Sequence, residues 1–192
     1  MRLVRLMPKL AAALEGIHDE LFREALVLGL KRSTIKVHSG PQNTALQTWL
    51  AEQDLRGMGP GLVDEFDAIQ TLSFPYFSRF PWRNPNITSD MDIGFMRKCK
   101  NLEMFTLYFV EREIFEQVPH PKPASTLRRQ HHLDEMLQLS SLETLRIAVP
   151  IHLDYWEYDD VHELAAWFKD EFAKLGRKVD AVAGAWEIPK AE

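Results

Sequence analysis

Three short segments of this chain repeat nearly the same pattern: Ile69–Phe74 (IQTLSF), Leu102–Leu107 (LEMFTL) and Leu142–Ile147 (LETLRI). Their first residues lie 33 and 40 residues apart, a spacing typical of repeated helix-and-strand units. Each segment alternates apolar and polar residues as a strand does. The second and third directly follow a predicted helix, and the first follows one across a glycine-rich linker at 57–61. One such unit cannot bury its apolar face alone, so we expect the units to stack side by side.

The rest of the chain alternates between helix and strand patterns. We predict helices at about 8–28, 44–55, 89–99, 126–139 and 160–175, and strands at about 34–38, 68–74, 102–110, 142–149 and 178–188. The first and last helices have regular apolar stripes: Leu10, Leu14, Ile17, Leu21, Ala25 and Leu28 on the first, and Val161, Leu164, Phe168, Phe172 and Leu175 on the last.

This alternation predicts an α/β fold, in which irregular leucine-rich-repeat-like helix-strand units form a mostly parallel sheet. We expect a single domain over 1–192, with an N-terminal helical and strand segment at 1–56 and the repeat-like units at 62–188. The least regular stretch is 75–88, where Pro75, Pro81 and Pro85 are expected to prevent a helix or a central strand.

Composition narrows the possible functions. The 192 residues are 45% hydrophobic and 27% charged, enough apolar material for one sizeable core. A net charge of −5 disfavours nucleic-acid binding, which needs a concentrated positive field. No apolar run approaches the ~18–20 residues that a membrane span requires. The single cysteine excludes a disulfide within the chain and indicates a reducing compartment, the cytoplasm or nucleus.

The N-terminus is basic and poor in acids. Arg2, Arg5 and Lys9 would suit a mitochondrial presequence, but a helix that begins near Pro8 explains the same segment, and we favour the helix.

The segments before the strands carry a further pattern. Cys99, Leu102, Phe105 and Leu107 have the C-x-x-L-x-x-L-x-L spacing of leucine-rich repeats, and Leu139, Leu142, Leu145 and Ile147 repeat it. With Glu24-Ala25-Leu26 leading to the strand at 33–37, the chain over residues 20–150 resembles the C-terminal region of uncharacterised F-box-like proteins of filamentous fungi. The Leu-Pro-x-Glu-like opening of an F-box is absent from the sequence. The resemblance implies a protein-binding scaffold or adaptor, and it implies no catalytic residue and no cofactor.

Aromatic and arginine residues gather after the first repeated strand. Such residues dominate the binding energy of protein interfaces. The candidate partner-binding residues are Tyr76, Phe77, Arg79, Phe80, Trp82 and Arg83. The alternative is that these rings fill the core beneath a long loop. The protein partner is not identified by the sequence, and the end strand of an open sheet also allows self-association.

A cluster of histidines and acids follows the third repeated strand and leads into the last helix. It contains His152, Asp154, Asp159 and His162, which could bind a divalent metal or act in a small enzyme at the C-terminal edge of the sheet. Their spacing matches no compact ligand motif, so we treat this as the alternative function.

Three further residues have simpler interpretations. His131 and His132 are predicted on a helix surface, where adjacent side chains diverge too far to bind one metal. Cys99 is predicted to be a buried packing residue rather than a nucleophile, because it lies on the apolar side of its helix.

Overall fold

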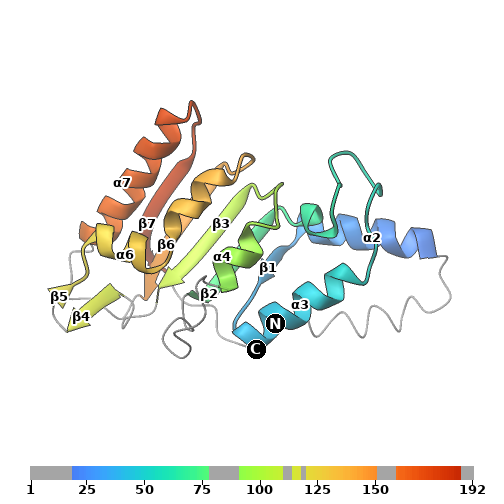
Figure 1. The fold of residues 1–192 in the computed structure, drawn as a ribbon, viewed down its shortest axis with the longest axis horizontal. Coiled ribbons are helices and arrows are strands. Elements are labelled where there is room, and N and C mark those ends of the chain that lie inside the picture. Colours follow the sequence, from blue (N-terminus) through green and yellow to red (C-terminus); the bar gives the residue numbers. More distant parts are fainter. Residues whose placement is uncertain (1–18, 78–90, 110–113, 118–119, 151–158, 187–192) are drawn as a thin grey trace.

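The computed structural model describes residues 19–77, 91–109, 114–117, 120–150 and 159–186, and its centre is a five-stranded parallel sheet (Figure 1). The strands are β1 (Thr34–Lys36), β2 (Thr71–Phe77), β3 (Met104–Phe109), β6 (Thr144–Pro150) and β7 (Asp180–Trp186). They lie in the order in which they occur in the sequence, and each pairs in parallel with the next. The predicted α/β fold with a parallel sheet is therefore confirmed.

A helix precedes each strand of this sheet. The helices are α2 (Asp19–Arg32), α3 (Gly40–Ala51), α4 (Met91–Met96), α6 (Ala124–Gln130) and α7 (Asp159–Lys174), with 3₁₀ turns η1 (Glu65–Ala68) and η2 (Leu133–Gln138). A small antiparallel ladder joins β4 (Phe115–Gln117) to β5 (His120–Pro121).

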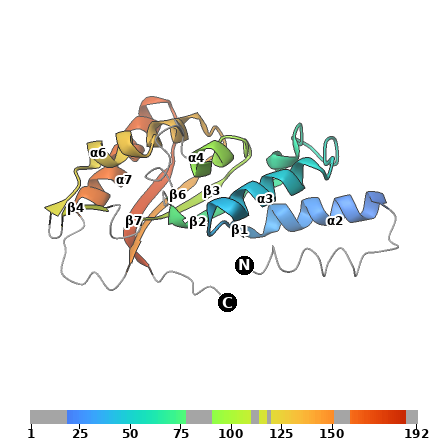
Figure 2. The ribbon, with the colours of Figure 1, turned by 60° about the horizontal axis from the view of Figure 1, so that its bottom comes forward.

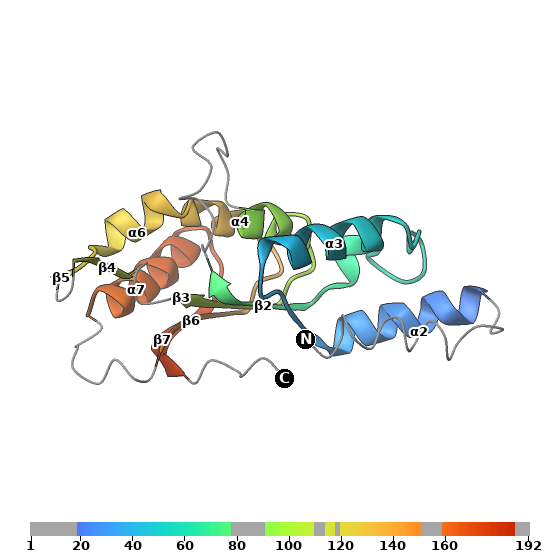
Figure 3. The same ribbon diagram turned by 90° about the horizontal axis from the view of Figure 1, so that it is seen from below.

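The strand order determines where the helices lie. Parallel crossovers are right-handed, so connections that always step in one direction place their helices on the same side of the sheet. Figure 3 shows α3, α4, α6 and α7 together on one side of the strands, and Figure 2 shows α2 and α3 at the β1 end with α6 and α7 at the β7 end. The described helices therefore leave the opposite side of the sheet without a helical layer.

The three similar segments are neighbours in space and in register. Thr71 pairs with Met104, and Met104 pairs with Thr144. These residues occupy the same place in the three segments, so the register reproduces the sequence alignment. The outer strands continue it, since Thr34 pairs with Thr71 and Thr144 with Asp180.

The turns that lead into these strands also share their hydrogen bonds. The backbone N–H groups of Ile69, Leu102 and Leu142 each donate to the carbonyl three residues earlier, at 3.1, 3.2 and 3.3 Å. The units are therefore equivalent in their backbone as well as in their sequence pattern.

The core lies between the sheet and its helices. Alternation directs one set of strand residues toward the helices, and these members of it are buried: Ile35, Val37, Leu72, Phe74, Phe105, Leu107, Leu145, Ile147 and Ala181. Phe74 and Phe105 meet edge to face at 5.6 Å between ring centroids. Cys99 is fully buried, as predicted, and burial raises the pKa of its thiol, which makes it a poor nucleophile.

Pro75 lies inside β2, which corrects the expectation that it would end the strand. Its missing N–H is tolerated for two reasons. The pairing with β1 reaches only as far as Ser73, and the register with β3 shifts between Phe74 and Phe77. Pro75 therefore sits at a β-bulge beyond the end of the neighbouring strand, where prolines are accepted.

The N-terminal helix buries a different side from the predicted one. Leu26, Val27 and Leu30 of α2 are buried, whereas Leu21 and Leu28 of the predicted stripe are 58% and 49% exposed. In α7 the predicted stripe is buried except for its last member, Leu175, which is 56% exposed.

The prediction for the two histidines is wrong for one of them. The helix predicted over 126–139 is interrupted at His132, whose φ of 52° lies in the left-handed region. This turn directs His131 into the core, where its ring lies 5.7 Å from that of Phe77 and 5.5 Å from that of Phe109. His132 is exposed, as expected.

Candidate functional site: the helix-free face of the sheet

The side of the sheet opposite the helices is the broadest candidate surface. Because side chains alternate along a strand, the residues between the core positions point to this side. We call it the helix-free face and define it by Lys36, Thr71, Met104, Tyr108, Thr144, Arg146 and Val182. Thr71, Met104 and Thr144 form one row across three strands, and Arg146 pairs with Val182 in the next row.

Access to this face varies along it. Arg146 is exposed, and the other defining residues are half-buried. Ser73 and Thr106, which lie between Lys36 and Arg146 in the same row, are only 3% and 8% exposed. The accessible part of the face is therefore the row through Thr71, Met104 and Thr144. Lys36 and Arg146, on either side of the buried Ser73 and Thr106, are accessible as well.

The face carries positive charge and aromatic groups. Lys36 and Arg146 are its cations, while Asp180 stands exposed at its edge on β7. The pKa of the Tyr108 hydroxyl is raised by burial, an effect that the charge of Arg146 opposes, so Tyr108 stays neutral and able to donate a hydrogen bond.

Tyr76 lies at the C-terminal end of the same face. Its ring is 6.0 Å from that of His38, which follows β1. Burial lowers the pKa of His38, and the charge of Lys36 lowers it further. A neutral imidazole beside a phenol is an amphipathic pair suited to contacts with a partner.

The other predicted partner-binding residues are placed differently. Phe77 is buried and meets Phe109 edge to face at 5.3 Å, so it belongs to the core beneath the helices. Arg79, Phe80, Trp82 and Arg83 lie outside the described residues. Of the six candidates, the described part of the chain places only Tyr76 near the helix-free face.

The predicted acidic and histidine cluster is only partly described. Asp159 and His162 lie in the first turn of α7 and are exposed, whereas His152 and Asp154 lie outside the described residues. Burial, followed by Glu163 and Asp159, raises the pKa of Asp160. Over the described ranges no group of three histidines, cysteines or acids could hold a metal ion.

The topology also bears on the enzyme alternative. In doubly wound α/β folds, ligands bind where the strand order reverses and two helices part. The described strands never reverse their order. The described sheet therefore has no such crevice.

The opposite, N-terminal edge of the sheet has an open hollow of about 530 Å³, lined by Glu143, Lys169, Ala173, Arg177, Lys178, Val179 and Asp180. Its most central cation is already engaged. The Arg177 guanidinium donates to the carbonyls of Leu137 and Leu142, at 3.3 Å each, and to that of Leu139, and it lies 4.8 Å from the Phe172 ring centre. Arg177 therefore links the segment before β7 to the segment before β6, and we call such a side-chain link between two units a clasp.

Asn101 has the corresponding role in an earlier unit. Its side-chain amide donates to the carbonyls of Gly61 and Asp67, both at 3.0 Å. Asn101 and Arg177 each lie three residues before the first residue of their strand, β3 and β7. Sequence reasoning missed both clasps, because the carbonyls that accept their hydrogen bonds lie 34 to 40 residues away in the chain.

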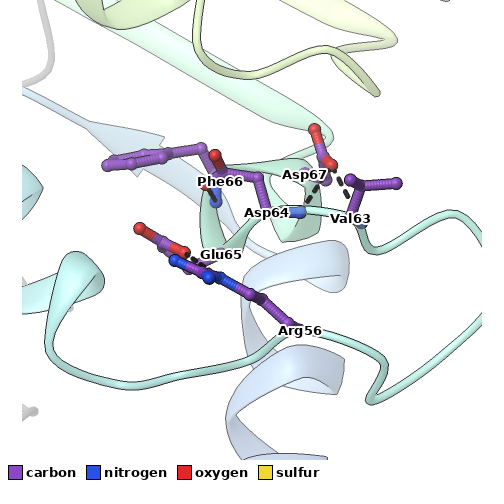
Figure 4. Close-up of polar contacts among 6 residues, drawn as sticks. All are labelled: Arg56, Val63, Asp64, Glu65, Phe66 and Asp67. Atoms are coloured by element: carbon purple, nitrogen blue, oxygen red, sulfur yellow. Dashed lines mark hydrogen bonds and ion pairs between the residues drawn. The ribbon is translucent and has the colours of Figure 1, made fainter.

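The acids before β2 are also structural (Figure 4). Asp64 caps η1 by accepting from the N–H of Phe66 at 3.2 Å, and Asp67 accepts from the N–H groups of Val63 and Asp64 at 3.1 and 2.9 Å. Glu65 is buried and lies 3.9 Å from the Arg56 guanidinium. These contacts hold the turn in place, although the Oδ1 atom of Asp67 is buried with no hydrogen-bond partner among the described residues.

Comparisons with known proteins add no assignment. No protein-family model matches the chain, and the comparisons with curated proteins and solved structures found no match. Among the described helices, none has both the length and the apolar character needed to cross a membrane.

Proposed function

We propose that this chain is a protein-binding scaffold, built from leucine-rich-repeat-like units, that presents the helix-free face of its sheet to a partner. The observation that carries the proposal is the strand order. Five parallel strands follow one another without reversal, and the described helices that cover the sheet lie on one side. Stacked units of this kind create an extended surface rather than a catalytic crevice.

The repeat pattern supports the leucine-rich-repeat-like description. The residues at the C-x-x-L-x-x-L-x-L positions are buried in both units: Cys99, Leu102, Phe105, Leu107, Leu139, Leu142, Leu145 and Ile147. In each unit these four residues span the turn and the strand that follows it, the same part of the unit that the motif occupies in a leucine-rich repeat. This agreement also supports the proposed likeness to the repeat region of F-box-like proteins.

The chemistry of the face favours a partner with acidic and hydrogen-bonding groups. Lys36 and Arg146 supply positive charge, and Tyr76 and Tyr108 supply rings with polar tips. The remaining predicted contacts, Arg79, Phe80, Trp82 and Arg83, lie outside the described residues and stay a prediction. The buried thiol of Cys99 suits a scaffold that works in the cytoplasm or nucleus.

The test is capture of partners by the intact chain from cells of its own source. We expect a protein retained by the wild type to be lost with the double variant Lys36→Glu/Arg146→Glu, because both substitutions reverse charge on the helix-free face. The matched control is Lys100→Glu/Arg129→Glu, which reverses two exposed cations in the turn before β3 and on α6. Equal retention by both variants, or no specific partner at all, would contradict the proposal.

A further inference from the structure

The outward side of α2 is apolar although the helix already buries its other side. Leu21, Ala25 and Leu28 recur at the spacing of one helical stripe, which we call the outer α2 stripe. Leu21 and Leu28 are 58% and 49% exposed and are two of the four large exposed hydrophobic residues in the described part of the chain. A surface helix needs only one apolar side, so a second one indicates a second contact.

The residues along the stripe allow another helix to approach closely. Ala25 lies at its centre and Gly29 beside it, and both are exposed. A side chain added at Gly29 would meet nothing within 4 Å. The two leucines stand at either end of this small-residue centre, about 10 Å apart along the axis.

The charges at the two ends of α2 differ in sign. Glu20 is exposed in its first turn, Lys31 and Arg32 occupy its last turn, and Arg23 and Glu24 between them carry opposite charges. A second α2 in the antiparallel direction would place Glu20 opposite the bases Lys31 and Arg32 at both ends, whereas a parallel one would oppose like charges. The stripe is therefore complementary to itself only in the antiparallel arrangement, the symmetry of a two-fold interface.

We propose that two copies of this chain associate through the outer α2 stripe, with their α2 helices antiparallel. A single helix pair buries less than the roughly 1,200 Å² of an ordinary stable interface, so the dimer is reversible and depends on concentration. This association leaves the helix-free face unused and does not rest on the scaffold function.

The first test is the mass of the intact protein in solution as its concentration rises, measured by light scattering or sedimentation. We expect the wild type to pass from monomer to dimer and Leu21→Glu/Leu28→Glu to stay monomeric. Leu175→Glu, one residue after the end of α7, is the matched control, because Leu175 is 56% exposed, and it should dimerise like the wild type. Thermal unfolding of each variant checks that it is folded.

Three outcomes would overturn the proposal. They are a wild type that stays monomeric throughout, a double variant that still dimerises, and a Leu175→Glu control that dissociates equally. In the first case a different protein, or residues 1–18 of the same chain, remains as the occupant of the stripe.

The second test exchanges charges. Glu20→Lys and Lys31→Glu/Arg32→Glu should each be monomeric alone, because antiparallel helices would then oppose like charges at both ends. Mixing the two folded variants should restore a dimer that contains one copy of each. A mixture that remains monomeric would contradict the pairing.

Oxidative cross-linking reports the direction of the helices. Cys99 is the only cysteine of the chain and is buried, so cross-linking of an introduced thiol can be measured while Cys99 stays in place. Ala25→Cys should cross-link to itself near the two-fold axis, and Leu21→Cys should not, because antiparallel helices place the two copies of residue 21 at opposite ends. Equal cross-linking of both variants would exclude the antiparallel arrangement.

Discussion

Helices α2 and α7 stand at opposite ends of the same sheet, and each was predicted with a regular apolar stripe, yet only the stripe of α7 showed which side is buried. In α7 the stripe through Val161, Leu164, Phe168 and Phe172 is buried, as its spacing predicts. In α2 the predicted stripe is the exposed one. The difference is that α7 has polar residues over most of its other side, whereas α2 has apolar residues on two sides.

The lesson is that periodicity identifies an apolar side but does not name its neighbour. Helix α7 packs along β7, so its side is determined by a long partner within its own unit. Helix α2 meets η1, a short turn that follows the next helix in the chain. Its buried side was therefore decided by a contact that no local pattern encodes.

The largest expected effect is at the centre of α7. Phe168 is fully buried, with its ring 4.7 Å from that of Trp167 and 6.1 Å from that of Phe172. Replacing it with alanine leaves a cavity and should lower the free energy of unfolding by about 3–5 kcal/mol. Urea denaturation would measure this. Leu175→Ala, an exposed position directly after the same helix, should change the free energy of unfolding by less than about 0.5 kcal/mol.

The second prediction inverts the sequence-based expectation for α2. Leu30→Ala should cost about 2–4 kcal/mol because Leu30 is fully buried, and Leu28→Ala should cost less than about 0.5 kcal/mol because Leu28 is half exposed. Both are measured by the same denaturation in dilute protein. A larger loss for Leu28→Ala than for Leu30→Ala would mean that the predicted stripe is the one that packs inward.

The parallel units were predictable because local patterns agree with the global arrangement. Alternation in the three similar segments specified which residues face the core, and the equal patterns specified the register. Pro75 was not predictable in the same way, because its place in β2 depends on how short β1 is. The clasps of Asn101 and Arg177 depend on where distant carbonyls lie, which only the assembled fold determines.

The candidate site was less accessible to sequence reasoning than the fold. Of the predicted partner-binding residues, Tyr76 lies by the helix-free face, Phe77 lies in the core, and the others fall outside the described residues. Lys36 and Arg146 were not proposed, because nothing local marks them. They become a pair of cations on one face only when the strands β1 and β6 are placed in the same sheet.

A third prediction concerns pH and the core between the two ends of the sheet. Burial lowers the pKa of His131 from 6.5 to about 3, helped by the charges of Lys122 and His132. Because the folded-state pKa is depressed, the unfolded chain binds the proton first as the pH falls. The contribution of neutral His131 to the free energy of unfolding should therefore be complete above about pH 6.5. Between pH 6.5 and pH 3 the free energy of unfolding should fall by up to about 1.4 kcal/mol per pH unit.

The comparison variant is His131→Leu, which removes the titrating group from the core. Its free energy of unfolding, measured across the same range, should fall less steeply with acid than that of the wild type. Parallel pH profiles for the two proteins would show that other groups carry the acid sensitivity. The described part of α2 contains no histidine, so variants of that helix should keep the wild-type profile.

The smallest prediction applies one substitution to both helices and expects opposite signs. Gly176 ends α7 with a φ of 73°, and the N–H groups of Gly176 and Arg177 donate to the carbonyls of Ala173 and Phe172, each at 2.9 Å. Gly176→Ala should cost about 1 kcal/mol from backbone strain alone, because its new methyl group would meet nothing within 4 Å. Gly29→Ala lies within α2, also in open space, and should stabilise by about 0.5–1 kcal/mol. Thermal unfolding of the two variants in dilute protein compares them directly. A loss of stability in Gly29→Ala as large as that in Gly176→Ala would show that α2 is not a regular helix at this point.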